Sequence, residues 1–359
     1  MSQKLRVLVV DDSALMRKLI PQILARDNEI EVVGTAMDGA FGLKKIEDLR
    51  PDVVTLDLEM PRMDGIETLR HITRRFRIPV IVVSALTTDG ASATFKALAL
   101  GAFDFVAKPR DAASAHMDEI AMDLIRKIKV AARSKVRAAS VPILPDRPRP
   151  NKQGLRPRRE PTKIIAIGIS TGGPNALQYL LAQLPGDFPA SIVVVQHMPQ
   201  GFTEMFSRRL DECCAIDVKE AQSGDLLIAG RALICPGDRH IKVRRMPLGN
   251  TVVLSDEDRM NGHRPSVDVL FRSVAVEFGS RAIGVLMTGM GDDGAAGLGQ
   301  MKDAGALTIA QSEDSCTVFG MPKAAIERGN AMRVVPLDMM ANTLAIQCNP
   351  EKIARAVQV

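Results

Sequence analysis

The sequence predicts two α/β domains, each built on a doubly wound sheet that is parallel or mostly parallel. In both halves of the 359 residues, short aliphatic runs alternate with longer amphipathic stretches. This is the pattern of buried parallel strands separated by helices. A stretch rich in proline and arginine interrupts the alternation. The length also exceeds that of one ordinary domain, so we expect two domains and a linker.

The first domain is assigned to residues 1–130, where five aliphatic runs are each followed by a helical pattern. Such repeats predict a parallel sheet with helices on its faces. The expected strands are Leu5–Val10, Ile30–Ala36, Val53–Leu56, Val80–Val83 and Phe105–Ala107, and the expected helices lie around Ser13–Arg26, Gly39–Leu49, Gly65–Arg75, Gly90–Leu100 and Ser114–Arg133.

Residues 131–161 have no apolar periodicity and include VPILPDRPRPNKQGLRPRREP. This composition predicts an extended linker, with docking or nucleic-acid binding as the less favoured alternatives. The net charge is +5, and basic residues far outnumber acidic ones between Arg133 and Arg159. A basic linker therefore explains the charge balance, and we expect no direct binding of nucleic acid.

The second domain, residues 162–359, resumes the strand–helix alternation, and the region Gly249–Leu254 suggests an additional antiparallel hairpin. The expected strands are Lys163–Ile169, Ile192–Gln196, Leu233–Cys235, Ala282–Thr288, Leu307–Ala310 and Met332–Val335, and the expected helices include Ala176–Gln183, Thr203–Asp211, Ser266–Glu277 and Gly294–Ala304.

Composition argues against several classes of protein. Aromatic residues make up 3% of the chain, which disfavours a base-stacking surface. The five cysteines form no C-x-x-C pair, so we expect reduced thiols and no disulfide framework or zinc site. No apolar run approaches the roughly 18 residues of a membrane span, and the first residues do not resemble a signal peptide. We expect a cytoplasmic protein that meets membranes only through a partner.

Charged and hydroxyl side chains follow several strands of the first domain. Asp11 and Asp12 follow the first strand, Asp57 the third, Ser84 the fourth and Lys108 the fifth. The carboxyl ends of parallel strands meet at one edge of a sheet, so these residues should converge. Three carboxylates with oxygen ligands suit Mg²⁺, and a lysine beside them could stabilise a phosphoryl group on a carboxylate.

A second candidate site begins at Ser170, within GISTGGP, where a strand runs into a helical pattern. This fits the strained turn G-x-S-x-G of serine hydrolases, although a glycine-rich turn also suits phosphate or dinucleotide binding. His197 follows the next strand and is the candidate base. The candidate acid lies in the loop GMGDDG, where the pattern does not choose between Asp292 and Asp293.

Two other motifs compete with this serine site. The run HRPSVD, residues 263–268, contains serine, histidine and aspartate, but triads are assembled from separate elements. We interpret it as the start of a helix that lines the substrate cleft, with Ser266 as a simple N-cap as the alternative. Cys316 is interpreted as a buried structural thiol rather than a nucleophile.

Across residues 4–125 the acidic set, with Lys108 followed by Pro109, resembles the receiver domain of two-component response regulators, a flavodoxin-like fold with five parallel strands. The resemblance implies that Asp57 is the site of phosphorylation. It also implies a receiver switch formed by Ser84 and Phe105, and contact between Lys108 and the phosphoryl group. The implied ligands of Mg²⁺ are Asp11, Asp12, Asp57 and the backbone carbonyl of Glu59.

From Lys163 to Val335 the motifs GISTGGP, QHMPQGFT, CPGDRH, HRPSVDVLF, TGMGDDGAAG and CTVFGMP resemble the CheB family of chemotaxis protein-glutamate methylesterases. The resemblance implies the catalytic triad Ser170, His197 and Asp293, where Asp292 stands at a position that is often asparagine in the family. It implies a backbone oxyanion donor at Met290. The implied oxyanion and substrate cleft also includes Thr171, Gly172, His263 and Arg264.

The implied function is phosphorylation-activated hydrolysis of glutamate γ-methyl esters on methyl-accepting chemoreceptors, with deamidation of receptor glutamines and no cofactor for the ester step. The implied phosphodonor is a histidine kinase of the CheA type. The alternative is a response regulator whose output domain binds nucleic acid or a nucleotide; it would need a basic recognition helix or a fuller phosphate-binding motif.

Overall fold

The computed structural model describes residues 4–85, 87–108, 117–133, 159–247 and 249–349. The chain divides into two compact units, Met1–Ala139 and Ser140–Val359, which are described separately. Most of the predicted linker, residues 134–158, lies outside the described residues, as do residues 109–116 and 350–359. Among the described residues, no helix combines the length and the apolar character needed to cross a membrane.

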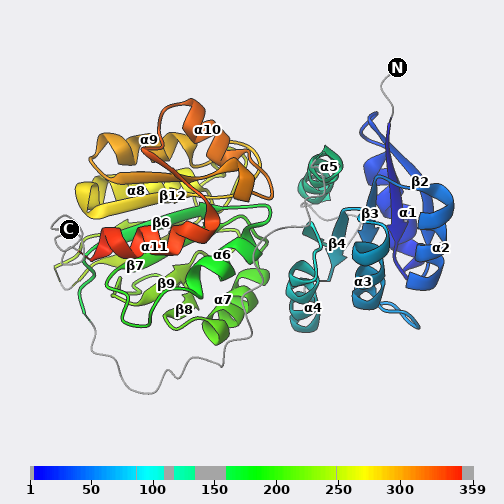
Figure 1. The fold of residues 1–359 in the computed structure, drawn as a ribbon, viewed down its shortest axis with the longest axis horizontal. Helices are drawn as coiled ribbons and strands as arrows, with labels where there is room; N and C mark the ends of the chain where they lie inside the picture. The colour runs from blue at the N-terminus through cyan, green and yellow to red at the C-terminus, as the bar shows by residue number, and fades with distance from the viewer. Residues whose placement is uncertain (1–3, 86, 109–116, 134–158, 248, 350–359) are drawn as a thin grey trace. The chain divides into compact units, whose positions relative to one another are not determined.

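The N-terminal unit is a five-stranded sheet in the order β2-β1-β3-β4-β5, with every neighbouring pair parallel (Figure 1). Its elements are β1 (Leu5–Val10), α1 (Ala14–Leu24), β2 (Ile30–Ala36), α2 (Gly39–Leu49), β3 (Val53–Leu56), α3 (Gly65–Arg75), β4 (Val80–Ser84), α4 (Thr88–Ala99), β5 (Asp104–Ala107) and α5 (Met117–Arg133). The predicted strand–helix alternation and the parallel five-stranded sheet are confirmed.

Polar residues begin four helices of this unit. The side chains of Ser13, Asp38, Asp64 and Thr87 each accept a hydrogen bond from a backbone N–H in the first turn of the following helix. Such caps satisfy donors that the helix itself leaves unpaired. Since these helices follow the strands directly, the caps fix the loops at the carboxyl edge of the sheet. The acidic pocket lies in those loops.

The C-terminal unit contains a seven-stranded sheet in the order β14-β13-β12-β6-β7-β9-β8, with every neighbouring pair parallel. The strands are β6 (Ile164–Ile169), β7 (Ser191–Gln196), β8 (Asp217–Glu220), β9 (Arg231–Ile234), β12 (Ala282–Leu286), β13 (Leu307–Gln311) and β14 (Arg333–Val335). A separate antiparallel hairpin of β10 (His240–Arg244) and β11 (Thr251–Ser255) confirms the hairpin suggested by the sequence.

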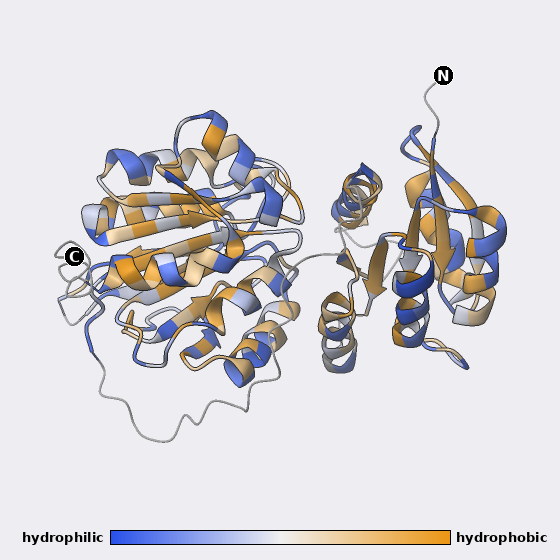
Figure 2. Cartoon of the chain, viewed as in Figure 1, coloured by the Kyte–Doolittle hydropathy of each residue, from blue (hydrophilic) through white to orange (hydrophobic). Residues whose placement is uncertain are grey.

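The helices of this unit form two layers (Figure 1). On one side α8 (Val267–Phe278), α9 (Ala295–Asp303) and α10 (Met321–Glu327) pack with the hairpin over the sheet, around a core that includes Val193, Ile241 and Phe271. The other layer contains α6 (Gly173–Leu181), α7 (Phe202–Cys213) and α11 (Leu337–Cys348). In Figure 2 the strands are mostly hydrophobic, whereas the helices carry both hydrophobic and hydrophilic residues. This is the pattern of a sheet buried on both faces.

Candidate active site and receiver pocket

Ser170 and His197 lie side by side because their strands are neighbours. In the parallel pairing of β6 with β7, Ile169 is opposite Gln196, and the two candidate residues follow that pair directly. The side-chain amide of Gln196 is buried and donates hydrogen bonds to the carbonyl oxygens of Ser170, at 3.0 Å, and His197, at 3.1 Å. The predicted nucleophile and base are thus brought together by sheet register.

Ser170 occupies a tight turn between β6 and α6, as the sequence predicted. Its N–H donates to the carbonyl of Thr288, and its own carbonyl accepts the N–H of Gly173 at 2.8 Å. Gly172 has φ 76°, in the left-handed region that glycine adopts without strain. A Cβ at Gly289 would lie 2.7 Å from the Cβ of Ser170, so only glycine lets that loop approach the serine. Ser170 is 7% exposed at this junction.

His197 pairs with Asp293 through one ring nitrogen. Nε2 of His197 lies 2.9 Å from Oδ2 of Asp293. The other nitrogen, Nδ1, is buried and has no hydrogen-bond partner within the described residues. The hydroxyl of Ser170 makes no hydrogen bond there either. The structure therefore joins the base to the acid directly and leaves Nδ1 available for the neighbouring serine.

The carboxylate of Asp293 sits at the start of α8. It accepts hydrogen bonds from the hydroxyl of Ser266 at 2.7 Å, the N–H of Val267 at 2.7 Å and the N–H of Asp268 at 3.3 Å. Burial opposes ionisation of Asp293, but these donors and His197 outweigh it and hold the pKa of Asp293 well below its usual range. An ionised acid in this position can orient the imidazole and stabilise its cation.

Asp292 points to a different partner, although it is adjacent to Asp293. Its carboxylate forms an ion pair with Arg328, just after α10, and its side chain is 57% exposed. Asp293, in contrast, is 1% exposed and reaches His197. The arrangement supports Asp293 as the acid, a choice that the sequence pattern alone could not make. The extra negative charge of Asp292 is compensated by Arg328.

Of the other predicted cleft residues, three lie beside Ser170 or His197, and Arg264 is bound by other groups. The ring of His263 stacks on that of His197, with centroids 4.0 Å apart and planes at 4°. Thr171 and Met290 flank Ser170 from its own turn and from the loop after β12, and neither backbone N–H donates to another group among the described residues. Arg264 is instead engaged by Asp238 and by the carbonyls of Asp256 and Glu257.

The structure also shows the surroundings of the two competing motifs, HRPSVD and Cys316. Ser266 holds the N-cap position of α8, but its hydroxyl makes no cap hydrogen bond and donates to Asp293 instead. Ser266 is thus the N-cap residue by position, as the alternative expected, but its side chain binds Asp293, so the HRPSVD run supports the acid rather than forming its own triad. Burial, followed by the nearby charges of Asp314 and Glu313, raises the pKa of the Cys316 thiol to about 12. Such a thiol is not a nucleophile at neutral pH.

In the N-terminal unit the predicted acidic pocket is present. Ligand oxygens of Asp11, Asp12 and Asp57 all lie within 4.8 Å of one another. Nζ of Lys108 lies 2.7 Å from Asp57 and 3.2 Å from Asp11. Backbone hydrogen bonds from Asp57 to the Val10 carbonyl and from Lys108 to the Ser84 carbonyl place these residues at one sheet edge.

The charges of this pocket are only partly balanced. Burial raises the pKa of Asp57 and of Asp11, although the ammonium of Lys108 opposes the rise. The Oδ2 atoms of these two carboxylates face the ammonium of Lys108 and have no other polar partner among the described residues. Three clustered carboxylates with spare oxygens fit a hard divalent cation such as Mg²⁺.

The two residues of the predicted receiver switch, Ser84 and Phe105, lie on the neighbouring strands β4 and β5. The Ser84 hydroxyl is buried and donates to the Gly90 carbonyl at 3.1 Å. Phe105 is buried and packs edge-on against Phe95, with centroids 6.4 Å apart. The N–H of Glu59 donates to Asp57 at 3.3 Å, so the backbone at Glu59 adjoins the acidic cluster.

Replacing Lys108 with alanine should destabilise the N-terminal unit by about 3 kcal/mol near neutral pH, because two buried carboxylates lose their counterion. Because burial raises the pKa of Asp11 and Asp57, protonation relieves this cost, and the loss should shrink as the pH falls. Urea unfolding of the full chain between pH 4 and 7 measures it. Lys45→Ala, which removes a bond to the Thr35 carbonyl only, should cost about 1 kcal/mol. Equal losses at all pH values would contradict the account.

Sequence reasoning missed two residues that support the C-terminal site. Asn261 donates to Asp293 at 3.3 Å and to Asp268 at 2.8 Å. Its Asn-Gly dipeptide is a turn signal that could have located it. Gln196 carries no such signal, because its role depends on two carbonyls that meet only in the folded sheet.

Comparison with known proteins identifies both units. Residues 165–344 match the family model of the CheB methylesterase, and residues 7–117 match that of the response regulator receiver domain. The chain is 62% identical over 355 residues to a protein-glutamate methylesterase/protein-glutamine glutaminase of Koribacter versatilis, covering 98% of each chain. It is 47% identical to the enzyme of the same name from Symbiobacterium thermophilum, over 95% of this chain and 96% of that one.

A solved structure supports the same assignment for the C-terminal unit. The catalytic domain of the Thermotoga maritima CheB methylesterase aligns with a TM-score of 0.50 and 42% identity, covering 51% of this chain and 97% of that one. The matched output domain is a methylesterase, so the alternative of a nucleic-acid or nucleotide output gains no support. The chain therefore belongs to the CheB family of protein-glutamate methylesterases/protein-glutamine glutaminases, with a response regulator receiver domain preceding the methylesterase domain.

Proposed function

We propose that Ser170, His197 and Asp293 form the catalytic triad that hydrolyses glutamate γ-methyl esters on methyl-accepting chemoreceptors. The observation that carries the proposal is the hydrogen bond of His197 to a buried, ionised Asp293, beside a serine on the adjacent strand. The pairing leaves Nδ1 of His197 as the proton acceptor for the serine hydroxyl. An acid, a base and a nucleophile from three strand ends are the parts that acyl transfer needs.

In this mechanism Ser170 Oγ attacks the ester carbonyl while His197 takes its proton. The tetrahedral oxyanion is stabilised by the N–H groups of Thr171 and Met290, a role supported by their lack of other partners among the described residues. His197 then protonates the departing methanol. Water then attacks the acyl-enzyme while His197 takes a proton from it. His197 returns this proton to Ser170 Oγ, and the glutamate carboxylate is released. Asp293 holds the imidazole and stabilises its cation throughout.

The same site accounts for deamidation of glutamine. An amide carbonyl passes through an equivalent tetrahedral intermediate, and His197 gives its proton to the amide nitrogen, which leaves as ammonia in place of methanol. Glutamine and methyl glutamate would then share one acyl-enzyme. The relatives carry both activities in their names, which supports this extension to the chain.

Control is proposed to run through Asp57 as the acceptor of a phosphoryl group from a histidine kinase of the CheA type. Asp11, Asp12, Asp57 and the carbonyl of Glu59 would hold Mg²⁺, which supplies charge neutralisation for the transferring phosphoryl group. Lys108 would neutralise the phosphoryl oxygens, since its ammonium already faces Asp57. Ser84 and Phe105 are proposed to couple the modification to the rest of the receiver domain. We place this activity in the cytoplasm.

Asp57→Asn should abolish activation by a small phosphodonor while leaving the basal esterase rate within about twofold. The asparagine keeps the size of the side chain but cannot form an acyl phosphate. The measurement is methanol released from membranes with methylated chemoreceptors, with and without phosphodonor and Mg²⁺. Asp52→Asn, at an exposed carboxylate that accepts the N–H of Arg6, is the matched control and should respond as the wild type does. Full activation of Asp57→Asn would refute the assignment.

A further inference from the structure

A tight turn, Met260–His263, lies beside the proposed catalytic pair. Its two ends exchange backbone hydrogen bonds of 3.1 and 2.9 Å. Both central residues have positive φ, 54° at Asn261 and 76° at Gly262. Positive φ at both positions and the Asn-Gly sequence are the features of a type I′ turn. The turn is therefore held by its own backbone hydrogen bonds and dihedral angles.

Side chains from this turn contact both the base and the acid. The ring of His263 stacks on the ring of His197 with their planes 4° apart. The amide nitrogen of Asn261 donates to Oδ1 of Asp293 at 3.3 Å and to Oδ2 of Asp268 at 2.8 Å. The contact with Asp293 uses the oxygen that does not face His197.

The two carboxylates bridged by Asn261 are both buried and close together, so their negative charges repel each other. Asp293 is 1% exposed and Asp268 is 2% exposed. Burial raises the pKa of Asp268, and the charge of Asp293 adds to the rise. A neutral side chain that donates to both carboxylates reduces the cost of holding them close together.

The same carboxylates also exchange helix caps. Asp293, just before α9, accepts the N–H groups of Val267 and Asp268 at the start of α8. Asp268, in the first turn of α8, accepts the N–H of Gly297 in α9 at 2.6 Å. Each helix start thus binds the carboxylate carried by the other segment, so hydrogen bonds link the positions of the two carboxylates.

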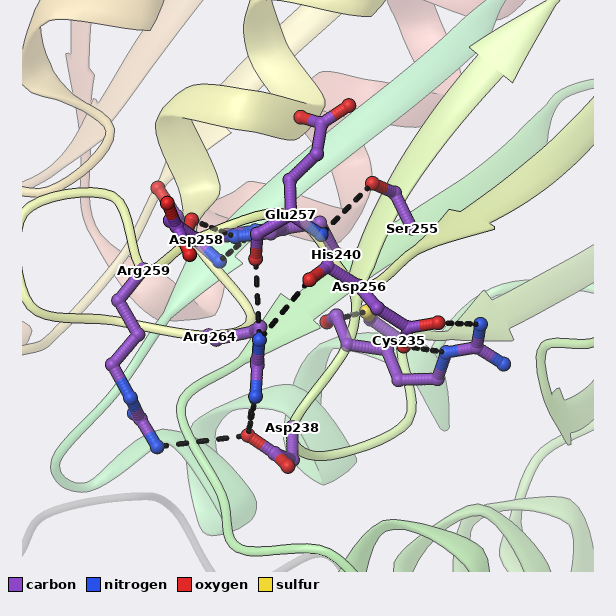
Figure 3. A network of polar contacts seen from close by, with 11 residues as sticks. Cys235, Asp238, His240, Ser255, Asp256, Glu257, Asp258, Arg259 and Arg264 are labelled. Atoms are coloured by element: carbon purple, nitrogen blue, oxygen red, sulfur yellow. Dashed lines mark hydrogen bonds and ion pairs between the residues drawn. The ribbon is translucent and has the colours of Figure 1, made fainter.

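The loop that carries the turn is anchored independently of the catalytic pair. Figure 3 shows Arg264 pointing to Asp238, which it meets at 2.9 Å, and to backbone carbonyls of the segment 256–257. Nε2 of His240 lies 3.0 Å from the carbonyl of Asp258, and its Nδ1 accepts the N–H of Ser266. These contacts hold both sides of the turn.

We propose that Asn261 is a positioning residue, whose amide bridges Asp268 and Asp293 and thereby fixes the carboxylate that receives His197. His263 supports the base from the same turn by stacking on its ring. This inference rests on the proposed function of the Ser170, His197 and Asp293 site. Asn261 acts through Asp293 and does not itself take part in proton transfer.

The test uses two substitutions that preserve the turn. Asn261→Gly keeps the positive φ and removes the amide, so kcat for methanol release should fall on the order of tenfold with KM changed less than about twofold. Asn261→Asp also suits a type I′ turn but places a third carboxylate against the other two, so kcat should fall further. Asn250→Gly makes the same side-chain change just before β11, at a position that contributes no residue to the site, and as the control it should retain the wild-type kcat.

A second measurement separates positioning from general stability. The imidazole N–H proton between His197 and Asp293 should shift and exchange faster in Asn261→Gly. It is measured at a temperature well below the melting points of this variant and of the Asn250→Gly control, because loss of a donor to two buried carboxylates also lowers the stability of Asn261→Gly. The double exchange Asn261→Asp with Asp268→Asn restores a donor–acceptor pair between 261 and 268 but leaves a carboxylate facing Asp293. We therefore expect no rescue of kcat.

Three results would overturn the inference: a wild-type kcat in Asn261→Gly, an unchanged imidazole proton, or rescue in the double exchange. Rescue would mean that the pair 261–268 matters without the bridge to Asp293. Ser170→Ala is assayed in parallel to separate the two claims. If it is inactive while Asn261→Gly is fully active, only the role of Asn261 fails. If Ser170→Ala keeps its activity, the proposed function fails.

Discussion

Replacing Ser170 with alanine should reduce kcat/KM for methanol release on the order of 10⁴-fold or more, because no oxygen remains to form the acyl-enzyme. The backbone N–H groups proposed for the oxyanion remain in place, so a small residual rate above the uncatalysed reaction is expected. The hydroxyl makes no hydrogen bond within the described residues. Its removal should therefore change the free energy of unfolding by less than about 1 kcal/mol. Methylated receptor membranes are the substrate for the assay.

Cys316→Ala is the control for this experiment, since Cys316 is the other candidate nucleophile in the C-terminal unit. Its thiol has a pKa raised to about 12 by burial, and so it stays protonated at the pH of the assay. We expect wild-type activity from this variant. Activity that survives Ser170→Ala but is lost in Cys316→Ala would reverse the assignment of the nucleophile.

The sites could be predicted from the sequence where a strand end alone decides the position of a residue. Asp11, Asp57 and Lys108 each follow a buried strand, and parallel pairing brings such positions to one edge. Ser170 and His197 follow two adjacent strands in matching register for the same reason. In these cases the order of parallel strands brings residues that are far apart in the sequence close together in space.

The sequence pattern could not decide where a contact depends on a distant segment. Asp292 and Asp293 are neighbours in one loop, and they differ because Arg328 binds the first and the start of α8 binds the second. The bridging role of Asn261 likewise needs Asp268 and Asp293 to be brought together by the packing of α8 on α9. Neither partner is visible in the local pattern.

Some elements were missed because their hydrophobic patterns are weak. The edge strand β8 has the sequence DVKE, in which only Val218 is buried, so it lacks the apolar run of an interior strand. In α11 the apolar residues are spread around the helix, with Met340 buried and Met339 more than half exposed. Such a helix does not show the single apolar stripe on which its prediction depends.

Asp293→Asn should lower kcat by a factor on the order of 10³–10⁴. An asparagine cannot accept all the donors of this site, because one of its two oxygens becomes an amide that must face His197, Ser266 or Val267. An amide facing Nε2 of His197 favours the tautomer that carries its proton on Nδ1, and Nδ1 could then no longer take the serine proton. The rate of methanol release at saturating receptor measures the loss.

The pH dependence of stability provides a second readout for the same variant. Because the pKa of Asp293 is held below its usual range in the folded protein, its ionisation stabilises the fold above the unfolded pKa, and this stabilisation is lost as the pH falls through the folded value. Asp293→Asn lacks this contribution, so its stability deficit should be largest near neutral pH and smaller in acid. Urea unfolding at pH 7 and pH 3 tests the sign.

Asp292→Asn is the matched control because it makes the same chemical change one residue earlier. It removes an ion pair with Arg328 in which both side chains are about half exposed, and such pairs contribute about 0–1 kcal/mol. We expect kcat within about threefold of the wild type and no pH-dependent deficit. The reverse outcome, with Asp292→Asn inactive and Asp293→Asn active, would show that the buried carboxylate at α8 serves the fold alone and that the exposed one serves catalysis.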